Sequence, residues 1–259
     1  QKVTAADDCT IDTIRQYAKQ CNCDIIEGES YNLVSQFRCN GSDGYLSLIN
    51  TILGMQPSPN AVLDLDYDIK VFDSPTEMRD MLRVKNLVNN KSRMLAGYCY
   101  NWVTQHHPTE MDIRLEDGFE AQWNFKDTST WAIDANSFEQ VGCIHTSQGL
   151  EFDYVGVLIG KDLTYNPATG RVETHKDAIS PDDKSSGIRN STTSPEDARR
   201  LILNTYKTLL TRGQKGCYVY CVDEKLAEYL KSSIGKEETN DTRNRNCIIR
   251  FEGWKHSDT

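Results

Sequence analysis

Residues 141–160 constrain the fold more than any other part of the chain, because two apolar segments flank a short polar turn. Residues 141–153 read Val-Gly-Cys-Ile-His-Thr-Ser-Gln-Gly-Leu-Glu-Phe-Asp, a buried strand that ends in a turn carrying His145, Gln148 and Glu151. Residues 154–160 are an unbroken apolar run, which is typical of a strand covered on both faces. The pattern predicts a parallel sheet, with the polar turn as a first candidate for chemistry.

The rest of the chain alternates between helix-like and strand-like segments, which predicts an α/β fold whose mostly parallel sheet has helices on both faces. Two capping boxes with proline at the first helical position, Ser-Pro-Thr-Glu at 74–77 and Ser-Pro-Glu-Asp at 194–197, mark helix starts. The expected helices are 11–20, 43–53, 75–88, 195–210 and 224–232. The expected strands are 24–27, 69–72, 93–98, 140–144, 154–160 and 216–222.

Three segments depart from this alternation within an expected domain of residues 1–235. Residues 100–138 are predicted to form a small β-rich insertion, with a hairpin around Glu116-Asp117-Gly118. Residues 162–194 are predicted to form a hairpin around 168–170, followed by a mobile loop rich in Ser, Asp and Lys. Residues 236–259 form a polar C-terminal tail.

The tryptophans of the insertion allow two interpretations. Trp102, Trp123 and Trp131 could stack on nucleic-acid bases. They could also form a small satellite core, and the usual role of buried aromatic residues favours this second interpretation. His106 and His107 precede a proline in a polar loop, where we expect both to be exposed to solvent.

Composition gives an expectation for the size of the core and for the cellular compartment of the chain. With 259 residues and 38% hydrophobic content the chain can bury a sizeable core. Its longest apolar runs fall far short of the roughly 20 residues that cross a bilayer, so no membrane partner is expected. Nine scattered cysteines and no signal peptide indicate a reducing, cytoplasmic location. Cys21 and Cys23 are the one close cysteine pair, which is too few ligands for zinc, and no metal site is predicted.

The distribution of charge suggests a localised nucleic-acid contact. A net charge of −9 argues against a free-standing nucleic-acid binder, because affinity for phosphates comes from clustered Lys and Arg. Between Arg199 and Cys221, however, there are five basic residues and no acidic one. We therefore expect a local basic face on an acidic domain, which would fit a protein that touches nucleic acid along one groove.

A second motif lies at residues 204–216, where a helix closes on an arginine and leads into an apolar strand. With the turn at 145–151, this segment resembles motifs V and VI of superfamily-1 helicases of the UvrD-like and RecD-like kind. Motif V is matched by His145, Thr146, Gln148, Gly149 and Glu151. Motif VI is matched by Leu210, Thr211 and Arg212.

Weaker matches extend the resemblance toward the N-terminus. Gln36-Phe37-Arg38 is similar to motif IV. The alternative is that the match to motif IV lies in a register shifted by one residue. Gln1 is similar to the glutamine of motif III, which would place the start of this chain at the end of a first motor domain. Over roughly residues 1 to 232 the sequence most resembles an uncharacterised bacterial family, domain of unknown function 2075, whose helicase-like region is shared with Schlafen proteins. The resemblance implies a RecA-like fold of the P-loop NTPase type, here the C-terminal motor domain.

The resemblance also implies roles for the matched residues at a shared ATP site. Arg212 and Arg38 would bring positive charge to the γ-phosphoryl group, an arginine-finger role worth about 10³ to 10⁵ in rate. Glu151 would accept hydrogen bonds from the ribose, Gly149 would allow close approach of the backbone, and Gln1 would also contact the nucleotide. A glutamate at the top of a parallel strand also fits the place where open α/β sheets bind ligands.

Other matched residues are implied in nucleic-acid binding, and each assignment has a structural alternative. His145 and Thr146 would donate to phosphate oxygens, while Gln148 could serve either surface. The alternatives are a histidine satisfied inside its turn, an ordinary salt bridge for Arg38, and for Arg212 a contact with the helix dipole worth ~0.3 to 1 kcal/mol. We expect Arg38, Glu151 and Arg212 along one edge of the sheet, with His145 and Thr146 beside them.

The chain lacks the parts of an ATPase that hold phosphate and magnesium. It has no Gly-x-x-x-x-Gly-Lys-Ser/Thr sequence and no early Asp-Glu pair after an apolar strand, so Walker A and Walker B are absent. We expect this chain alone to be inactive and to bind no cofactor, with ATP and Mg²⁺ bound by the full-length protein. The expected partners are a missing N-terminal RecA-like domain and single-stranded nucleic acid, with DNA favoured. The alternative is a hydrolysis-deficient RecA-like module that binds nucleic acid or protein, and sequence upstream of residue 1 would distinguish the two.

Overall fold

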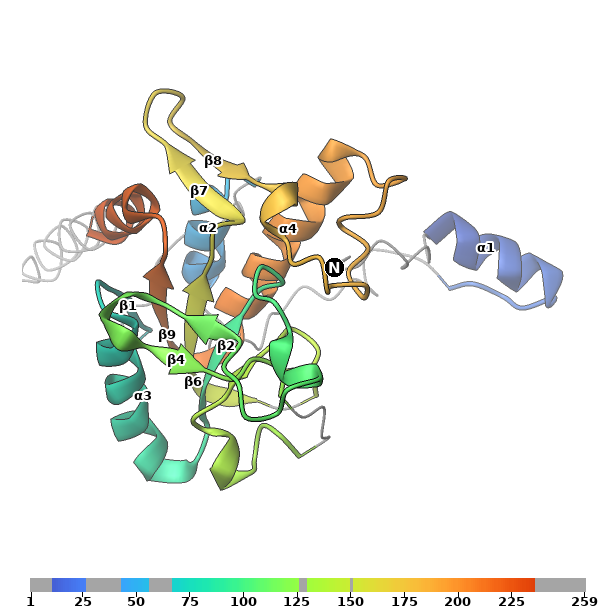
Figure 1. Cartoon of the computed structure of the whole chain (residues 1–259). Coiled ribbons are helices and arrows are strands. Elements are labelled where there is room, and N and C mark those ends of the chain that lie inside the picture. The colour runs from blue at the N-terminus through green and yellow to red at the C-terminus, as the bar shows by residue number, and fades with distance from the viewer. Residues whose placement is uncertain (1–10, 27–42, 56–66, 126–129, 150, 236–259) are drawn as a thin grey trace, which may run out of the picture.

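The computed structural model describes residues 11–26, 43–55, 67–125, 130–149 and 151–235, and the structural statements below concern these (Figure 1). Their centre is a five-stranded sheet in which every neighbouring pair is parallel. In spatial order its strands are β1 (Asp68–Phe72), β9 (Gly213–Cys221), β6 (Phe152–Ile159), β2 (Ser92–Ala96) and β5 (Val141–Gly142). The predicted α/β fold with a parallel sheet is therefore confirmed.

Helices cover both faces of this sheet. On one face α3 (Pro75–Asn89) contacts β1, β2, β6 and β9. It can lie close because β6 offers no side chain at Gly156, where a Cβ atom would sit 2.3 Å from Leu82 Cδ1. On the other face α4 (Pro195–Leu210) packs on β6, and α2 (Asp43–Ile52) packs against α4.

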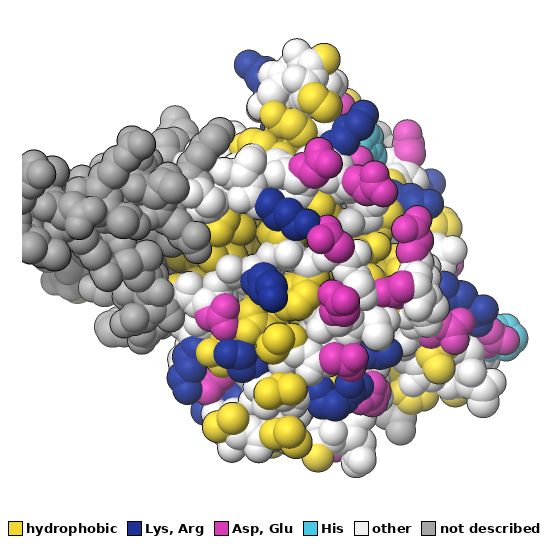
Figure 2. All heavy atoms as spheres, turned by 90° about the vertical axis from the view of Figure 1, so that its left-hand side faces the viewer, with side chains coloured by type: hydrophobic (Ala, Val, Ile, Leu, Met, Phe, Trp, Pro, Cys, Tyr) yellow, Lys and Arg dark blue, Asp and Glu magenta, His cyan; other side chains and the backbone are white. Residues whose placement is uncertain are grey.

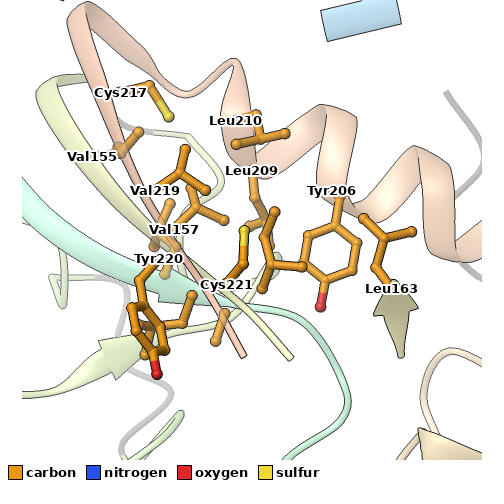
Figure 3. Close-up of a cluster of buried hydrophobic side chains, with 14 of the residues drawn as sticks. Val155, Val157, Leu163, Tyr206, Leu209, Leu210, Cys217, Val219, Tyr220 and Cys221 are labelled. Atoms are coloured by element: carbon orange, nitrogen blue, oxygen red, sulfur yellow. The ribbon is translucent and has the colours of Figure 1, made fainter. Parts of the chain in front are cut away.

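The core between α4 and the sheet follows from strand alternation, since successive side chains of a strand point to opposite faces. Figure 3 shows Val155 and Val157 of β6 beside Val219 of β9, all facing Leu209 and Tyr206 of α4. The Tyr206 hydroxyl donates to Asp162 Oδ1 at 2.5 Å. Asp162 is 1% exposed, and burial raises the pKa of its carboxyl. This hydrogen bond ties α4 to the segment that follows β6.

Both helices that begin with a predicted capping box start where expected. The Ser74 hydroxyl accepts the N–H of Glu77 at 3.1 Å, and the Ser194 hydroxyl accepts the N–H of Asp197 at 3.0 Å. The helices α1 (Ile11–Gln20), α2 and residues 224–235 also match their predictions. Residues 24–26 form no strand, contrary to expectation. Residues 36–40 and the tail 236–259 lie outside the described residues.

The insertion contains the predicted hairpin and its own small core. Strands β3 (Ile113–Arg114) and β4 (Glu120–Ala121) pair antiparallel across residues 116–118. Trp123 is 4% exposed and Trp131 is 2% exposed, which confirms the satellite-core interpretation for these two. Trp102 is half-buried and lies edge-on to Trp123, with ring centroids 6.2 Å apart.

Residues 162–194 begin with the predicted hairpin, formed by β7 (Leu163–Asn166) and β8 (Arg171–Thr174). The segment after it, which we predicted to be a mobile loop, packs against the body of the protein. Ile179 and Ile188 are 1% and 0% exposed. The Lys176 ammonium donates to the carbonyls of Asn190 and Thr193, at 3.0 and 2.8 Å. Buried anchors and internal hydrogen bonds thus hold a segment whose composition is that of a solvated loop.

The surface along α3 carries mixed charge. Figure 2 shows the side of the molecule where α3 lies, with acidic and basic side chains interspersed and hydrophobic ones between them. Val84, Leu87 and Val88 of α3 are exposed hydrophobic residues. On the part of this face that the described residues form, Figure 2 shows no continuous basic surface for a phosphate backbone. Among the residues that the structure describes, no helix is both long and apolar enough to span a bilayer.

Candidate functional site

Two of the predicted nucleotide contacts lie together at the edge where the strands begin, here called the amino edge. Phe152 of β6 pairs with Gly213 of β9. Glu151 and Arg212 directly precede these paired residues, so they leave the same edge from adjacent strands. Glu151 is exposed and Arg212 is half-buried. The expected shared edge is confirmed for this pair, but it is not the carboxyl-end edge that we expected for Glu151.

The backbone around Arg212 is fixed from both sides. The Thr211 hydroxyl donates to the Lys207 carbonyl at 2.8 Å and closes α4. On the strand side, a Cβ atom on Gly213 would lie 2.1 Å from the carbonyl oxygen of Gly216, so only glycine fits there. Two hydroxyls brace this junction, from Tyr45 to the Leu210 carbonyl at 2.7 Å and from Tyr67 to the Gly213 carbonyl at 3.1 Å. Arg212 therefore projects from a rigid helix-to-strand junction.

An ion pair that the sequence analysis missed lies at the same edge. Asp153 Oδ2 accepts hydrogen bonds from Lys215 Nζ at 2.6 Å and from Asn89 Nδ2 at 2.8 Å. Burial acts to raise the pKa of the Asp153 carboxyl, but the hydrogen bonds from Lys215 and Asn89 outweigh it and the pKa lies below its ordinary value. The pair joins β6, β9 and α3 beside Glu151. Its only sequence signal is an aspartate at the end of the motif V segment.

The turn between β5 and β6 carries the chain to the opposite edge of the sheet. Gly142 at the end of β5 pairs with Leu95, whereas Tyr154 near the start of β6 pairs with Ser92. At about 3.3 Å per residue, these levels differ by roughly 10 Å along the strands. His145 therefore lies near the edge where the strands end, here called the carboxyl edge. The expectation that His145 and Thr146 lie beside Glu151 and Arg212 is wrong, because the turn runs back along the sheet.

Within the turn, each matched residue has a distinct environment. His145 is exposed, and its Nε2 lies 3.2 Å from the Tyr98 hydroxyl. Thr146 is 8% exposed, and its hydroxyl accepts from the Cys143 N–H at 2.8 Å and donates to the Cys143 carbonyl at 3.1 Å. The Thr146 hydroxyl therefore closes the turn. Gln148 is exposed, and Gly149 has a φ of +84°, a conformation that favours glycine.

A cavity of about 290 Å³ opens at the carboxyl edge beside His145. We call it the aromatic cavity, because Tyr98, Tyr100, Trp102 and Trp123 contribute to its wall. The remaining lining comes from residues 105–106, Asn124, the turn at residues 143 and 145, and the loop at 180–185. Of this lining, His145 and the tryptophans were predicted from the sequence as candidate contacts. The two tyrosines and the loop were not predicted, although Tyr98 and Tyr100 directly follow a predicted strand.

Two predicted site residues, Gln1 and Arg38, lie outside the described residues. Their predicted roles stay predictions. Across the described ranges, no group of three or more His, Cys, Asp or Glu side chains could hold a metal ion. Cys21 and Cys23 are exposed free thiols.

Comparison with known proteins supports the resemblance to the Schlafen helicase-like region. A family model for the Schlafen group 3 DNA/RNA helicase domain matches residues 1–223. An uncharacterized protein of Saccharomyces cerevisiae is 26% identical over 227 residues, in a match that covers 77% of this chain. The chain spans 47% of the length of that yeast protein.

Proposed function

The chain belongs to the family of Schlafen group 3 DNA/RNA helicase domains, and on this premise we propose that it is the second RecA-like domain of a superfamily-1 nucleic-acid-dependent ATPase. One observation carries the proposal. Glu151 and Arg212, which motifs V and VI assign to the nucleotide, directly precede the paired residues Phe152 and Gly213. The whole protein would be a helicase or translocase, with its ATP site between this domain and a first RecA-like domain.

The chemistry at the amino edge follows from charge. Hydrolysis of ATP spreads negative charge over the γ-phosphoryl oxygens, and a cation from the second domain stabilises that charge. The Arg212 guanidinium would supply it from a rigid junction, and Glu151 would accept hydrogen bonds from the ribose. A Walker A sequence, which this chain lacks, and a Walker B acid would come from the first domain with Mg²⁺. Fixed positioning matters because a preorganised charge needs no rearrangement during the reaction.

The carboxyl edge would contact single-stranded nucleic acid through His145. The turn at residues 143–151 begins at this edge and ends at Glu151 on the other. A bound nucleic-acid strand that moves His145 would therefore act on the segment that leads to Glu151. This connection is a physical route by which strand binding could stimulate hydrolysis.

The test uses a protein that joins this chain to a P-loop domain preceding it. Arg212→Ala should lower kcat for strand-stimulated ATP hydrolysis by about 10³-fold or more, because the transition-state charge loses its cation. Arg200→Ala is the matched control, since Arg200 is an exposed arginine of α4 paired with Asp197. An unchanged kcat for Arg212→Ala would contradict the assignment. A full-length protein without any P-loop would instead favour a hydrolysis-deficient binding module.

A further inference from the structure

We propose that the aromatic cavity binds one unpaired nucleobase of a single strand while the phosphates stay outside. This inference rests on the proposed function and specifies how the strand is held. The cavity lies where β2 and β5 end, next to His145 and away from Glu151 and Arg212. It is thus separate from the proposed contacts to ATP.

The size of the cavity fits a single ring system. Its volume of about 290 Å³ is near the lower limit of small-molecule pockets, which span about 300 to 1,000 Å³. A base fits this space, whereas several linked nucleotides do not. A strand could therefore insert one base and keep its backbone at the mouth.

The walls of the cavity offer flat apolar surfaces. Tyr100 and Trp102 are half-buried, so each is held in place while still partly accessible. Trp123, which is 4% exposed, packs edge-on against Trp102 with an interplanar angle of 80° and restrains its ring. Bases stack on such aromatic faces regardless of their identity.

Unsatisfied donors favour a base over an apolar side chain as the occupant. The ring N–H groups of Trp102 and Trp123 have no hydrogen-bond partner among the described residues. Buried donors without acceptors cost free energy, and a ligand with acceptors can offset it. Bases carry carbonyl and ring-nitrogen acceptors. Because these donors are closed to solvent, contact with them requires a small shift of the rings.

The charges around the cavity place the phosphates at its rim. The carboxylates of Asp182 and Asp183 would repel a phosphate inside the cavity. Asp183 also accepts hydrogen bonds from Ser185 and Ser186, so it holds the loop in position. The basic lining residues are His106, His145 and Lys184, which are all exposed. These three can meet backbone phosphates while the base lies deeper.

The experiment compares two labelled oligonucleotides binding to the full chain at low salt. One carries bases throughout, and the other is abasic, so the phosphates are the same. The base-bearing strand should bind about 5- to 150-fold more tightly, the range expected for stacking of one base. Trp102→Leu should remove this difference without changing the affinity for the abasic strand. Equal affinity for the two strands, or an equal loss on both with Trp102→Leu, overturns the proposal.

Two further arms keep the test decisive. His106→Ala should weaken strand binding more than His107→Ala, because both histidines are exposed but only His106 lines the cavity. Equal effects of the two substitutions would count against the placement of the strand. A free nucleoside monophosphate is also tested as a competitor. If it displaces the base-bearing strand at the same concentration as an unlabelled oligonucleotide of equal length, the single-strand proposal is overturned in favour of a free-nucleotide site.

Failure of this inference and failure of the proposed function give different results. If Arg212→Ala abolishes hydrolysis in the two-domain protein but base-bearing and abasic strands bind alike, only the base pocket is wrong. If the strands differ as expected but Arg212→Ala leaves kcat unchanged, the pocket stands and the motor assignment falls. Circular dichroism and thermal unfolding of Trp102→Leu check that the half-buried site has kept its fold.

Discussion

The two edges of the parallel sheet are built in different ways. At the amino edge, Glu151 and Arg212 sit where adjacent strands begin, and backbone geometry fixes the position of Arg212. At the carboxyl edge, the aromatic cavity is assembled from side chains of several segments far apart in sequence. One edge presents two charged groups at strand starts, with Arg212 on a rigid junction, and the other presents a partly closed apolar space with polar groups at its mouth.

This difference indicates that the two edges of the domain have separate roles, one toward a phosphoryl group and one toward nucleic-acid bases. Charge held rigidly at a strand start suits electrostatic stabilisation of a phosphoryl group, where displacement is costly. An aromatic cavity suits sequence-independent stacking, which tolerates different bases. His145 and Glu151 are close in the sequence and lie at opposite edges, which makes coupling between the edges physically possible. The predictions below test whether the edges have these separate roles.

The largest expected effect concerns the amino edge without its partner domain. This chain alone should show no ATP turnover, because it has neither a Gly-x-x-x-x-Gly-Lys-Ser/Thr phosphate-binding loop nor an early Asp-Glu pair after an apolar strand. Phosphate release by a purified preparation measures this. If the chain alone turns over ATP steadily and Arg212→Ala abolishes that turnover, the amino edge works without a first domain. The contrast drawn between the amino and carboxyl edges would then be wrong.

A smaller effect is expected when Glu151 loses its charge in the two-domain protein. Glu151→Gln should raise KM for ATP about 10-fold or more, because hydrogen bonds to a charged group contribute about 1.5 to 3 kcal/mol. Glu228→Gln is the control, since Glu228 is exposed in the helix at residues 224–235. The difference between base-bearing and abasic strands should be the same in both variants. A change in that difference for Glu151→Gln would mean that the edges do not act separately.

The connecting turn gives a third test, with a modest effect. Gly149→Ala should lower the free energy of unfolding by about 1 to 2 kcal/mol, because its φ of +84° is unfavourable for alanine. Gly170→Ala is the control: it has a φ of +65° and, like Gly149, has no atom within 4 Å of an added Cβ. Urea unfolding should show similar losses for both variants. Only Gly149→Ala should also reduce the stimulation of ATP hydrolysis by a nucleic-acid strand in the two-domain protein. Equal stimulation in the Gly149→Ala and Gly170→Ala variants would contradict a coupling role for the turn.

The smallest effect is the pH dependence of the Asp153 ion pair at the amino edge. The folded-state pKa of Asp153 lies below its unfolded value of about 3.9, so its contribution to stability is full above that pH and is lost as pH falls through the folded pKa. The difference in unfolding free energy between the native chain and Asp153→Asn should therefore be constant near neutral pH and shrink below about pH 4. Asp80→Asn, which removes an exposed ion pair with Arg83, is the control. A difference that grows on acidification would contradict the ion-pair account.

Local sequence signals predicted most of the secondary structure. The capping serines Ser74 and Ser194 predicted the starts of α3 and α4, because their hydroxyls satisfy N–H groups of the first turn. The unbroken apolar run at 154–160 predicted β6, which is covered on both faces. The predicted strand at 140–144 shrank to Val141–Gly142, because Thr146 closes a turn on Cys143. The side-chain hydrogen bond of Thr146, which the apolar pattern of residues 140–144 does not reveal, thus ends that strand early.

The sequence by itself determined the helices, the strands of the parallel sheet and the motif residues that the strand starts bring together, because these depend on periodicity, capping and local backbone geometry. Only the tertiary structure decided that His145 lies at the opposite edge from Glu151, since that follows from the pairing of β5 and β6 with β2. It also decided that the loop after β8 packs inward and closes the aromatic cavity. Burial of Ile179 and Ile188 and the meeting of Tyr98, Trp102 and Trp123 depend on contacts between distant segments. Such contacts form only when the whole chain folds, so no local pattern records them.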